Sequence, residues 1–438
     1  MIGQDALYWI WLASKCGVAS RHFDKLIQKY PNPFDIYRLE SDEIAHLDGL
    51  ADTQKDKLCE KDLDAAYDVM KYCKSNKIDI ITYVDRRYPE RLKNLQDPPI
   101  LLYCMGHFPN FNESLCVAMV GTRSMNEYGK QSAYKIAYEL SAAGALVVSG
   151  MALGIDGVAA VGALSAGGKT VAVLGCGIDT VYPKHHKKLM EQIAKHGAVI
   201  TEYLPKEEPH GYNFPKRNRI ISGLCQGTVV VQASMDSGAL ITARRAIDQG
   251  REVFAIPGKI NDEESEGPNS LIREGAYAVL TADDILKNYE FLYSDLIDKK
   301  NLSRARKNMP LADPALEKYG LFYALGGEDR EEKVFSVKGL RKRKADKSQT
   351  QTSERDVPQE APKDEPKTDA TEQSNAALIE SLDANTRKIL ESLPLDKAIS
   401  VDKVIVEGIG VTETITALTM LEIEGLVTSL PGGLFMRK

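Results

Sequence analysis

A short cationic segment, NFPKRNRIISG from Asn213 to Gly223, holds the side chains best suited to binding a charged ligand. It places Lys216, Arg217 and Arg219 within four positions, close to the aromatic residue Phe214. Guanidinium and ammonium groups pair with phosphate, and an aromatic face can stack on a base. Because the whole chain has a formal net charge of −6, this positive charge is local. The segment therefore indicates a groove that binds single-stranded nucleic acid without sequence preference.

Glycine-rich loops follow the strands that the sequence predicts. Glycine lets backbone N–H groups approach a phosphate, and a following helix adds its positive N-terminal end. For any single loop, a plain tight turn between strand and helix is the simpler interpretation. Five glycine-led loops at one sheet edge, with Arg123, Arg217 and Arg219 among them, favour an anion-binding groove. The loops that follow the first six predicted strands are VGTRS (120–124), SGMALGID (149–156), GCGIDTVYP (175–183), EYLPKEEPHGYNFPKRNRI (202–220), ASMDSGALITARRA (233–246) and PGKINDEESEGPNSLI (257–272).

These loops contain no complete set of catalytic residues. Nothing matches the phosphate-binding pattern GxxxxGK[ST], and VGTRSMNEYG has the wrong spacing for GxGxxG. The carboxylates at strand ends are Asp156, Asp179 and Glu202, and the first two lie near helix starts, where capping is the simpler role. Three histidines remain, two at a predicted solvated helix start and one near the cationic segment as a possible contact: His185, His186 and His210. We expect no catalytic residues, no cofactor and no metal site.

Between residues 78 and 295 the sequence alternates short apolar runs with amphipathic segments. Runs that are apolar throughout predict strands buried on both faces, which are typical of a parallel sheet covered by helices. Right-handed crossovers then give an α/β fold, an extended Rossmann-like, doubly wound parallel sheet. The predicted strands are CVAMVG, ALVVSG, TVAVLGCG, AVITEY, TVVVQA, EVFAIPG and YAVL.

The segments on either side of the sheet have different characters. Residues 1–77 predict a helical module, SAM-like or helix-hairpin-helix-like, with a plain helical hairpin as the simpler interpretation. Residues 296–328 predict a partly ordered extension, and the charged, aromatic-poor residues 329–375 predict a disordered linker. Residues 376–438 predict a winged-helix domain. Its third helix, TETITALTMLEIEGL, has no Lys or Arg, which favours protein docking or a weak contact over reading duplex DNA.

The composition is that of a globular protein, with 43% hydrophobic and 27% charged residues. A length of 438 residues suggests about three domains. The N-terminal segment has no cationic leader, and no apolar stretch approaches the roughly 18 residues of a membrane helix. The seven cysteines are scattered, which is typical of a reducing compartment. We therefore expect a cytoplasmic protein with no membrane partner.

The order of these motifs resembles the DNA-processing protein A (DprA/Smf) family over residues 84 to 290. The resemblance implies a non-catalytic protein that binds and protects single-stranded DNA during natural transformation. It also implies that the protein loads the RecA recombinase onto that DNA and acts as a homodimer. The segments that carry the resemblance are VAMVGTRSMNEYG, SGMALGID, GKTVAVLGCGIDTVYP, FPKRNRIISGL, DSGALITARRAIDQGREVFAIPG and GPNSLIREGA.

The resemblance also implies which residues contact DNA. Two positions depart from the family pattern and each loses a hydroxyl: Ala239 replaces a serine, and Pro268 replaces a threonine. If Arg217 contacts DNA, Arg217→Glu should abolish binding without unfolding the protein. The family's DNA-contacting pattern falls on Gly121, Thr122, Arg123, Ser149, Gly150, Phe214, Lys216, Arg217, Asn218, Arg219, Ser237, Gly238 and Thr242.

An alternative of a different class is a Rossmann-fold nucleotide-processing enzyme, similar to the phosphoribohydrolases. Those enzymes share the sheet and the glycine-rich loops. Their PGGxGTxxE pattern should occur near the fifth strand, where this chain has MDSGALITARR (235–245). The missing acid would remove the general acid or base that hydrolysis needs.

Overall fold

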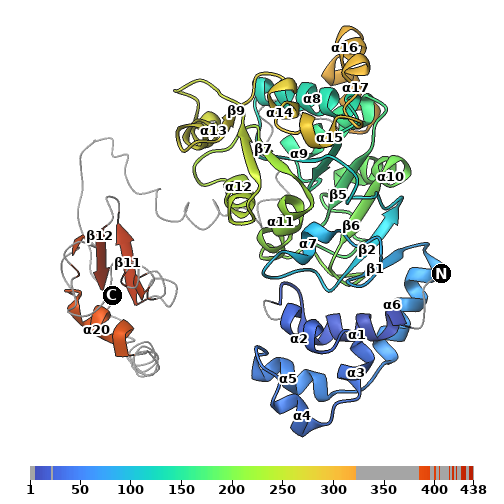
Figure 1. Cartoon of the computed structure of the whole chain (residues 1–438). Helices are drawn as coiled ribbons and strands as arrows, with labels where there is room; N and C mark the ends of the chain where they lie inside the picture. Colours follow the sequence, from blue (N-terminus) through green and yellow to red (C-terminus); the bar gives the residue numbers. More distant parts are fainter. Residues whose placement is uncertain are drawn as a thin grey trace, which may run out of the picture. The chain divides into compact units, whose positions relative to one another are not determined.

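The computed structural model places the chain in two compact units, Met1–Asp346 and Lys347–Lys438, each considered by itself. The predicted linker, 329–375, lies outside the described residues. In the first unit, six helices precede a large sheet that is covered by further helices (Figure 1). The residues described are 5–20, 23–321, 384–394, 399–400, 404, 414, 417–418, 421, 426–430 and 434–437.

The six N-terminal helices pack around two tryptophans of the first helix. Trp9 and Trp11 are each 1% exposed, and Trp11 Nε1 donates to the carbonyl of Glu60 at 3.1 Å. The helices belong to the same compact unit as the sheet, while the SAM or helix-hairpin-helix likeness and the domain boundary at residue 77 stay predictions. They are α1 (Asp5–Cys16), α2 (Phe23–Lys29), α3 (Pro33–Tyr37), α4 (Ser41–Ala45), α5 (Asp52–Cys59) and α6 (Asp64–Ser75).

The described residues of the first unit form a nine-stranded sheet in the order β1-β2-β6-β5-β4-β3-β7-β8-β9. From β6 to β9 every neighbouring pair is parallel. The strand order reverses between β3 and β7, which is where doubly wound sheets place their ligands. The parallel strands are β3 (Cys116–Val120), β4 (Leu146–Ser149), β5 (Thr170–Val173), β6 (Ala198–Thr201), β7 (Gly227–Val230), β8 (Glu252–Ala255) and β9 (Tyr277–Ala278).

The seven predicted strands form the parallel part of the sheet, but the prediction missed two antiparallel strands at one edge. There β1 (Asp79–Thr82) pairs antiparallel with β2 (Leu101–Gly106), and β2 pairs antiparallel with β6. The strand β2, in the run ILLYCMG, could not be predicted from the sequence pattern, because the run lies outside the regular alternation of strand and helix. Only two residues of the predicted strand YAVL pair in the sheet, as β9.

Helices cover the two faces of the sheet, and alternate residues of one strand point to opposite faces. Val117 and Met119 of β3 pack in the core that includes residues of α8 (Glu127–Ala142), α9 (Ile155–Ser165) and α10 (Lys187–His196). Cys116, Ala118 and Val120 pack in the second core. The helices of that second face are α7 (Glu90–Lys93), α11 (Asn213–Leu224), α12 (Gly238–Asp248) and α13 (Glu263–Arg273).

The described part of the predicted extension, 296–321, is ordered as two helices that follow α14 (Asp283–Leu286) and α15 (Glu290–Tyr293). These are α16 (Lys299–Lys307) and α17 (Ala312–Lys318), and both contact α8. Arg306 of α16 forms an ion pair of 2.8 Å with Glu139 of α8, and Glu139 is only 1% exposed. Residues 322–328 lie outside the described residues.

The second unit, in its described residues, contains α20 (Ala384–Ser392) and a three-stranded antiparallel sheet ordered β10-β12-β11. The predicted hairpin corresponds to β11 (Val427–Leu430) and β12 (Leu434–Arg437), and β10 (Ile399–Ser400) adds a strand. A small core includes Ile389, Leu390, Leu418 and Leu421. The winged helix itself stays a prediction, because most of its third helix lies outside the described residues.

None of the helices among the described residues is both long enough and apolar enough to cross a membrane.

Candidate nucleic-acid interface

The cationic segment folds as α11, the helix that carries the chain from β6 back across the sheet to β7. Its apolar residues Ile220, Ile221 and Leu224 are buried against the sheet. Pro215 is tolerated near the start of the helix, because the first backbone N–H groups have no partner within the helix. The start of α11 therefore presents Phe214 and Lys216 near the ends of the parallel strands.

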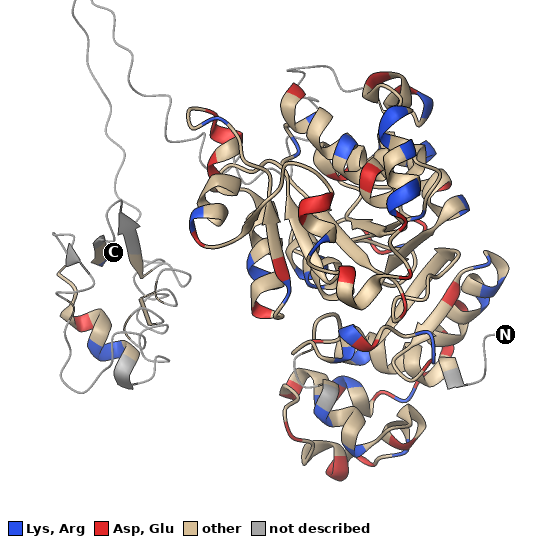
Figure 2. Cartoon of the chain, turned by 45° about the horizontal axis from the view of Figure 1, so that its top comes forward, with Lys and Arg blue, Asp and Glu red and all other residues tan. Residues whose placement is uncertain are grey.

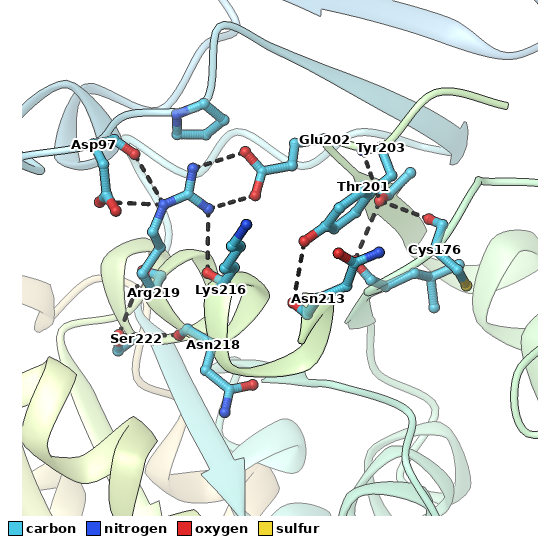
Figure 3. A network of polar contacts seen from close by, with 12 residues as sticks. Asp97, Cys176, Thr201, Glu202, Tyr203, Asn213, Lys216, Asn218, Arg219 and Ser222 are labelled. Atoms are coloured by element: carbon cyan, nitrogen blue, oxygen red, sulfur yellow. Dashed lines mark hydrogen bonds and ion pairs between the residues drawn. The ribbon is translucent and has the colours of Figure 1, made fainter. Parts of the chain in front are cut away.

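Arg219 is not available to a ligand, because a buried ion pair holds its guanidinium. The side chain is 1% exposed, and its Nη1 and Nη2 meet the two carboxylate oxygens of Glu202 at 2.5 and 2.7 Å (Figure 3). Its Nε donates to the carbonyl of Asp97 at 2.9 Å and lies 3.2 Å from the Asp97 carboxylate. Burial by itself would lower the pKa of Arg219, but the Glu202 carboxylate raises it above its ordinary value. The predicted DNA contact is instead a structural pair that fixes α11 to β6.

Arg217 is also buried, at 4% exposed, and binds backbone rather than solvent. Its Nη1 donates to the carbonyls of Gly150, at 2.8 Å, and Val173. Burial lowers the pKa of Arg217 and raises that of Asp156, whose carboxylate accepts the N–H of Gly150 at 3.0 Å. This network ties α11 to the loop after β4 and to the last residue of β5. Because Arg217 is buried and bonded within the fold, we expect Arg217→Glu to disturb folding, unlike the expectation from the sequence alone.

Several predicted contacts in the loops serve the packing of the loops themselves. Ser149 Oγ donates to the carbonyl of Met119 at 2.8 Å, and Thr242 is 1% exposed. The hydroxyl of Thr122 accepts the N–H of Ser124 at 3.1 Å, and that of Ser237 accepts the N–H of Ala239 at 3.3 Å as the cap of α12. For these loops, the tight-turn interpretation accounts for the hydroxyl groups.

Glycine is required at two of these positions for close packing. A Cβ at Gly121 would lie 2.5 Å from Cγ1 of Ile155 and 2.9 Å from the carbonyl of Gln232. A Cβ at Gly150 would meet the guanidinium of Arg217. At Gly238, by contrast, nothing lies within 4 Å of the added atom. Backbone packing, not only ligand approach, therefore explains Gly121 and Gly150.

A group of exposed and partly exposed rings and cations remains at the start of α11. The guanidinium carbon of Arg123 lies 5.6 Å from the centroid of the Phe214 ring, and the centroids of the Phe214 and Tyr182 rings are 5.2 Å apart. Two residues earlier, Tyr212 is 62% exposed, and Nζ of Lys216 lies 5.4 Å from its centroid. His210 stacks on Tyr212 at 5.3 Å and an interplanar angle of 8°. We call this group the aromatic–cation cluster: Arg123, Tyr182, His210, Tyr212, Phe214 and Lys216.

The predicted site residues thus separate into two sets. Arg123, Lys216 and Gly238 are exposed, and Gly121, Phe214, Asn218 and Ser237 are partly exposed; the buried set is Thr122, Ser149, Gly150, Arg217, Arg219 and Thr242. The sequence prediction missed Tyr182 and Tyr212. Tyr212 could have been recognised from the sequence, because it is an aromatic residue only two positions before Phe214. Tyr182 lies in a loop that is distant in sequence, and no sequence pattern links it to Phe214.

The candidate carboxylates are occupied within the fold. Asp179 accepts from Tyr72 Oη and from the N–H of Lys206, both at 2.7 Å, and Glu202 pairs with Arg219. The expected capping role of Asp156 is wrong, because Gly154 occupies the cap of α9 and Asp156 binds the Gly150 loop. Among the described residues, no group of three or more His, Cys, Asp or Glu could hold a metal ion.

The predicted solvated helix start at His185 and His186 is correct only for the first of them. His186 is 1% exposed, and its Nδ1 lies 3.0 Å from the carbonyl of Met151, while His185 is exposed. Burial lowers the pKa of His186 to about 4.

The fold and the cluster define a Rossmann-like protein with exposed rings and cations at the ends of its parallel strands. Residues 79–290 match the family described as DNA recombination-mediator protein A. DNA processing protein DprA of Bacillus subtilis is 40% identical over 48% of this chain and 71% of its own length. DprA of Streptococcus pneumoniae is 44% identical over 48% of this chain and 73% of its own length. The X-ray structure of DprA from Streptococcus pneumoniae covers 64% of this chain and 97% of its own, with a TM-score of 0.55 and 35% identity.

The chain belongs to the DprA/Smf family of DNA-processing proteins, which confirms the resemblance seen in the motifs.

Proposed function

We propose that this protein binds single-stranded DNA at the aromatic–cation cluster. The observation that carries the proposal is the arrangement around Phe214, whose ring lies beside Tyr182 and under the guanidinium of Arg123. Rings accept the faces of unpaired bases, and neighbouring cations neutralise the phosphates between them. Lys216 and Tyr212, each two residues from Phe214, repeat the same combination. Bases paired in a duplex present no free face, so the cluster favours a single strand.

We further propose that the protein loads the RecA recombinase onto the bound strand and acts as a cytoplasmic homodimer. The support is membership in a family described as a recombination mediator. In this proposal the sheet domain spans residues 78–295, with the helical segment and the winged helix as accessory modules. RecA loading is tested by following strand exchange by RecA on DNA coated with a single-strand-binding protein, with and without this protein. Unchanged strand exchange contradicts the loading role.

We propose a non-catalytic role with no cofactor. The candidate acids for a nucleotide-processing reaction are engaged elsewhere, since Glu202 pairs with buried Arg219 and Asp156 is 7% exposed. A hydrolase needs a carboxylate within reach of its substrate. Incubation with nucleoside monophosphates should release no free base. Release of base by the purified protein, lost in an acid-to-amide variant, would establish the enzyme alternative.

The test of DNA binding is fluorescence anisotropy with a labelled oligothymidine and a matching duplex, each at low and high salt. We expect tight binding to the single strand only, weakened by salt because phosphate contacts release counterions. Lys216→Glu should weaken binding severalfold, whereas Lys71→Glu, an exposed lysine on α6, should not. Equal binding of both variants would place the DNA away from the cluster.

A further inference from the structure

The helix α16 is a basic surface element outside residues 79–290, the segment that matches the family. Its sequence, KKNLSRARK, contains no acidic residue, although the chain as a whole is acidic. Figure 1 shows α16 beside α17 and α8, and in Figure 2 its blue turns lie at the upper right.

Two of its cations hold the helix in place. Lys299 pairs with Glu290 at 2.8 Å, and Arg306 pairs with Glu139 at 2.8 Å and Asp283 at 2.6 Å. Further contacts fix its start and its inner face. Asn301 Nδ2 donates to the carbonyl of Ala142 at 2.7 Å, and Leu302 is 2% exposed. These contacts therefore fix the orientation of α16 on α8.

The other three cations, Lys300, Arg304 and Lys307, are exposed. None of them forms an ion pair with another residue in the part of the chain that the structure describes. Their spacing of four and three residues puts them on one face of the helix. At a rise of 1.5 Å per residue, they follow one another along about 10 Å of its length.

The side chains on the exposed face of α16 indicate which kind of partner it binds. The apolar residues of α16, Leu302 and Ala305, face the protein: Leu302 is buried, and Ala305 packs against the core. A protein interface is usually anchored by aromatic or apolar side chains, and a membrane-surface helix needs an exposed apolar face. A row of cations alone suits the phosphate backbone of a nucleic acid.

We propose that Lys300, Arg304 and Lys307 form a second nucleic-acid contact, which binds the phosphodiester backbone. This contact is distinct from the aromatic–cation cluster. Asn301 binds Ala142 at the end of α8, whereas Arg123 of the cluster precedes the start of that helix. The 16 residues of α8 separate the two by about 24 Å along its axis. The backbone could belong to the same strand beyond the cluster or to an adjoining duplex.

The test compares two variants of equal charge. The α16 variant carries Lys300→Glu, Arg304→Glu and Lys307→Glu. The control carries Lys57→Glu, Lys74→Glu and Lys169→Glu, at three exposed lysines dispersed over other elements. Circular dichroism and thermal unfolding establish that both fold, and a version with three Gln substitutions replaces the α16 variant if it does not.

Anisotropy is then measured with a long oligothymidine and with a duplex that carries a single-stranded tail, across a salt series. We expect the α16 variant to bind about 10-fold more weakly at low salt, and its log–log salt slope to fall by about 2, as three lost phosphate contacts imply. Loss on the oligothymidine would assign the contact to the single strand, and loss on the tailed duplex alone would assign it to the adjoining duplex. Affinities and slopes equal to those of the control on both probes would overturn the proposal.

The result is independent of the function proposed for the cluster. Lys216→Glu tests the cluster by itself, and if the two contacts are separate its effect should multiply with that of the α16 variant. An effect of the α16 variant without any effect of Lys216→Glu would keep the second contact and remove the first.

Discussion

Arg219 and Glu202 form a bidentate ion pair in the interior, with Nη–Oε distances of 2.5 and 2.7 Å and both side chains at most 4% exposed. The pair joins α11 to the end of β6, and so it sets the position of the helix that carries Phe214 and Lys216 (Figure 3). Two of the three cations of the segment, Arg217 and Arg219, therefore hold the helix in place, and only Lys216 faces solvent.

Removing one partner of this pair should destabilise the protein strongly. Arg219→Ala leaves the Glu202 carboxylate buried without its counter-charge, and we expect a loss of about 3–5 kcal/mol in the free energy of unfolding. Urea denaturation followed by circular dichroism measures the loss. Lys216→Ala, three residues away and exposed, is the matched control, with an expected change below about 0.5 kcal/mol. Equal stability of the two variants would contradict the structural role of Arg219.

Two glycines from the predicted DNA-contacting set should respond oppositely to alanine. Gly121→Ala forces a Cβ against Ile155 and the carbonyl of Gln232, so we expect about 1–3 kcal/mol of destabilisation from overpacking. Gly238→Ala, in the first turn of α12 with open space around it, should be neutral or stabilising by up to about 1 kcal/mol. Thermal unfolding of the two variants is the measurement. Destabilisation by Gly238→Ala would show that its surroundings are tighter than described.

The sequence predicts the Rossmann-like core because apolar runs and glycine-led loops are local patterns. Val117 to Val120 read as a buried strand whatever lies beside them, and the structure places them in β3. The antiparallel edge is different, since β2 pairs with β6 across more than 90 residues of chain, and such pairing leaves no mark in either segment.

The candidate site could be predicted only in part, for the same reason. Three cations in four positions suggest an exposed anion groove, but exposure depends on partners that are distant in sequence. Asp97 and Glu202 bury Arg219, and the carbonyls of Gly150 and Val173 bury Arg217. Tyr182 reaches Phe214 from the loop after β5, which no spacing within α11 could reveal.

His186 should make the stability of the protein depend on pH. Burial lowers the pKa of His186 to about 4, below its ordinary value of about 6.5, so the unfolded chain binds a proton before the folded one does. The contribution of neutral His186 is fully present above pH 6.5 and is lost as the pH falls towards 4. Over that interval we expect a loss of up to about 3 kcal/mol.

The measurement for His186 is urea denaturation of the protein and of His186→Asn at pH 7.5, 6 and 5. Asn can still donate to the carbonyl of Met151 but does not titrate. We therefore expect the protein to lose more stability than the variant as the pH falls. Parallel pH profiles would mean that His186 is not the group responsible.

The exposed ring of Tyr212 and the partly exposed ring of Phe214 should each contribute to binding of a single strand. Phe214→Leu and Tyr212→Leu remove a stacking face but keep an apolar side chain, and each should weaken binding of oligothymidine by about 1–3 kcal/mol. Tyr212→Phe keeps the ring and should retain the affinity, which separates stacking from a role of the hydroxyl group. Because stacking involves no phosphate, the salt slope should stay unchanged in the leucine variants, whereas Lys216→Gln should reduce it by about 0.7. Anisotropy titrations across a salt series measure both the affinity and the salt slope. A leucine variant that lowers the salt slope but not the affinity would mean that its ring positions the cation and does not stack on a base.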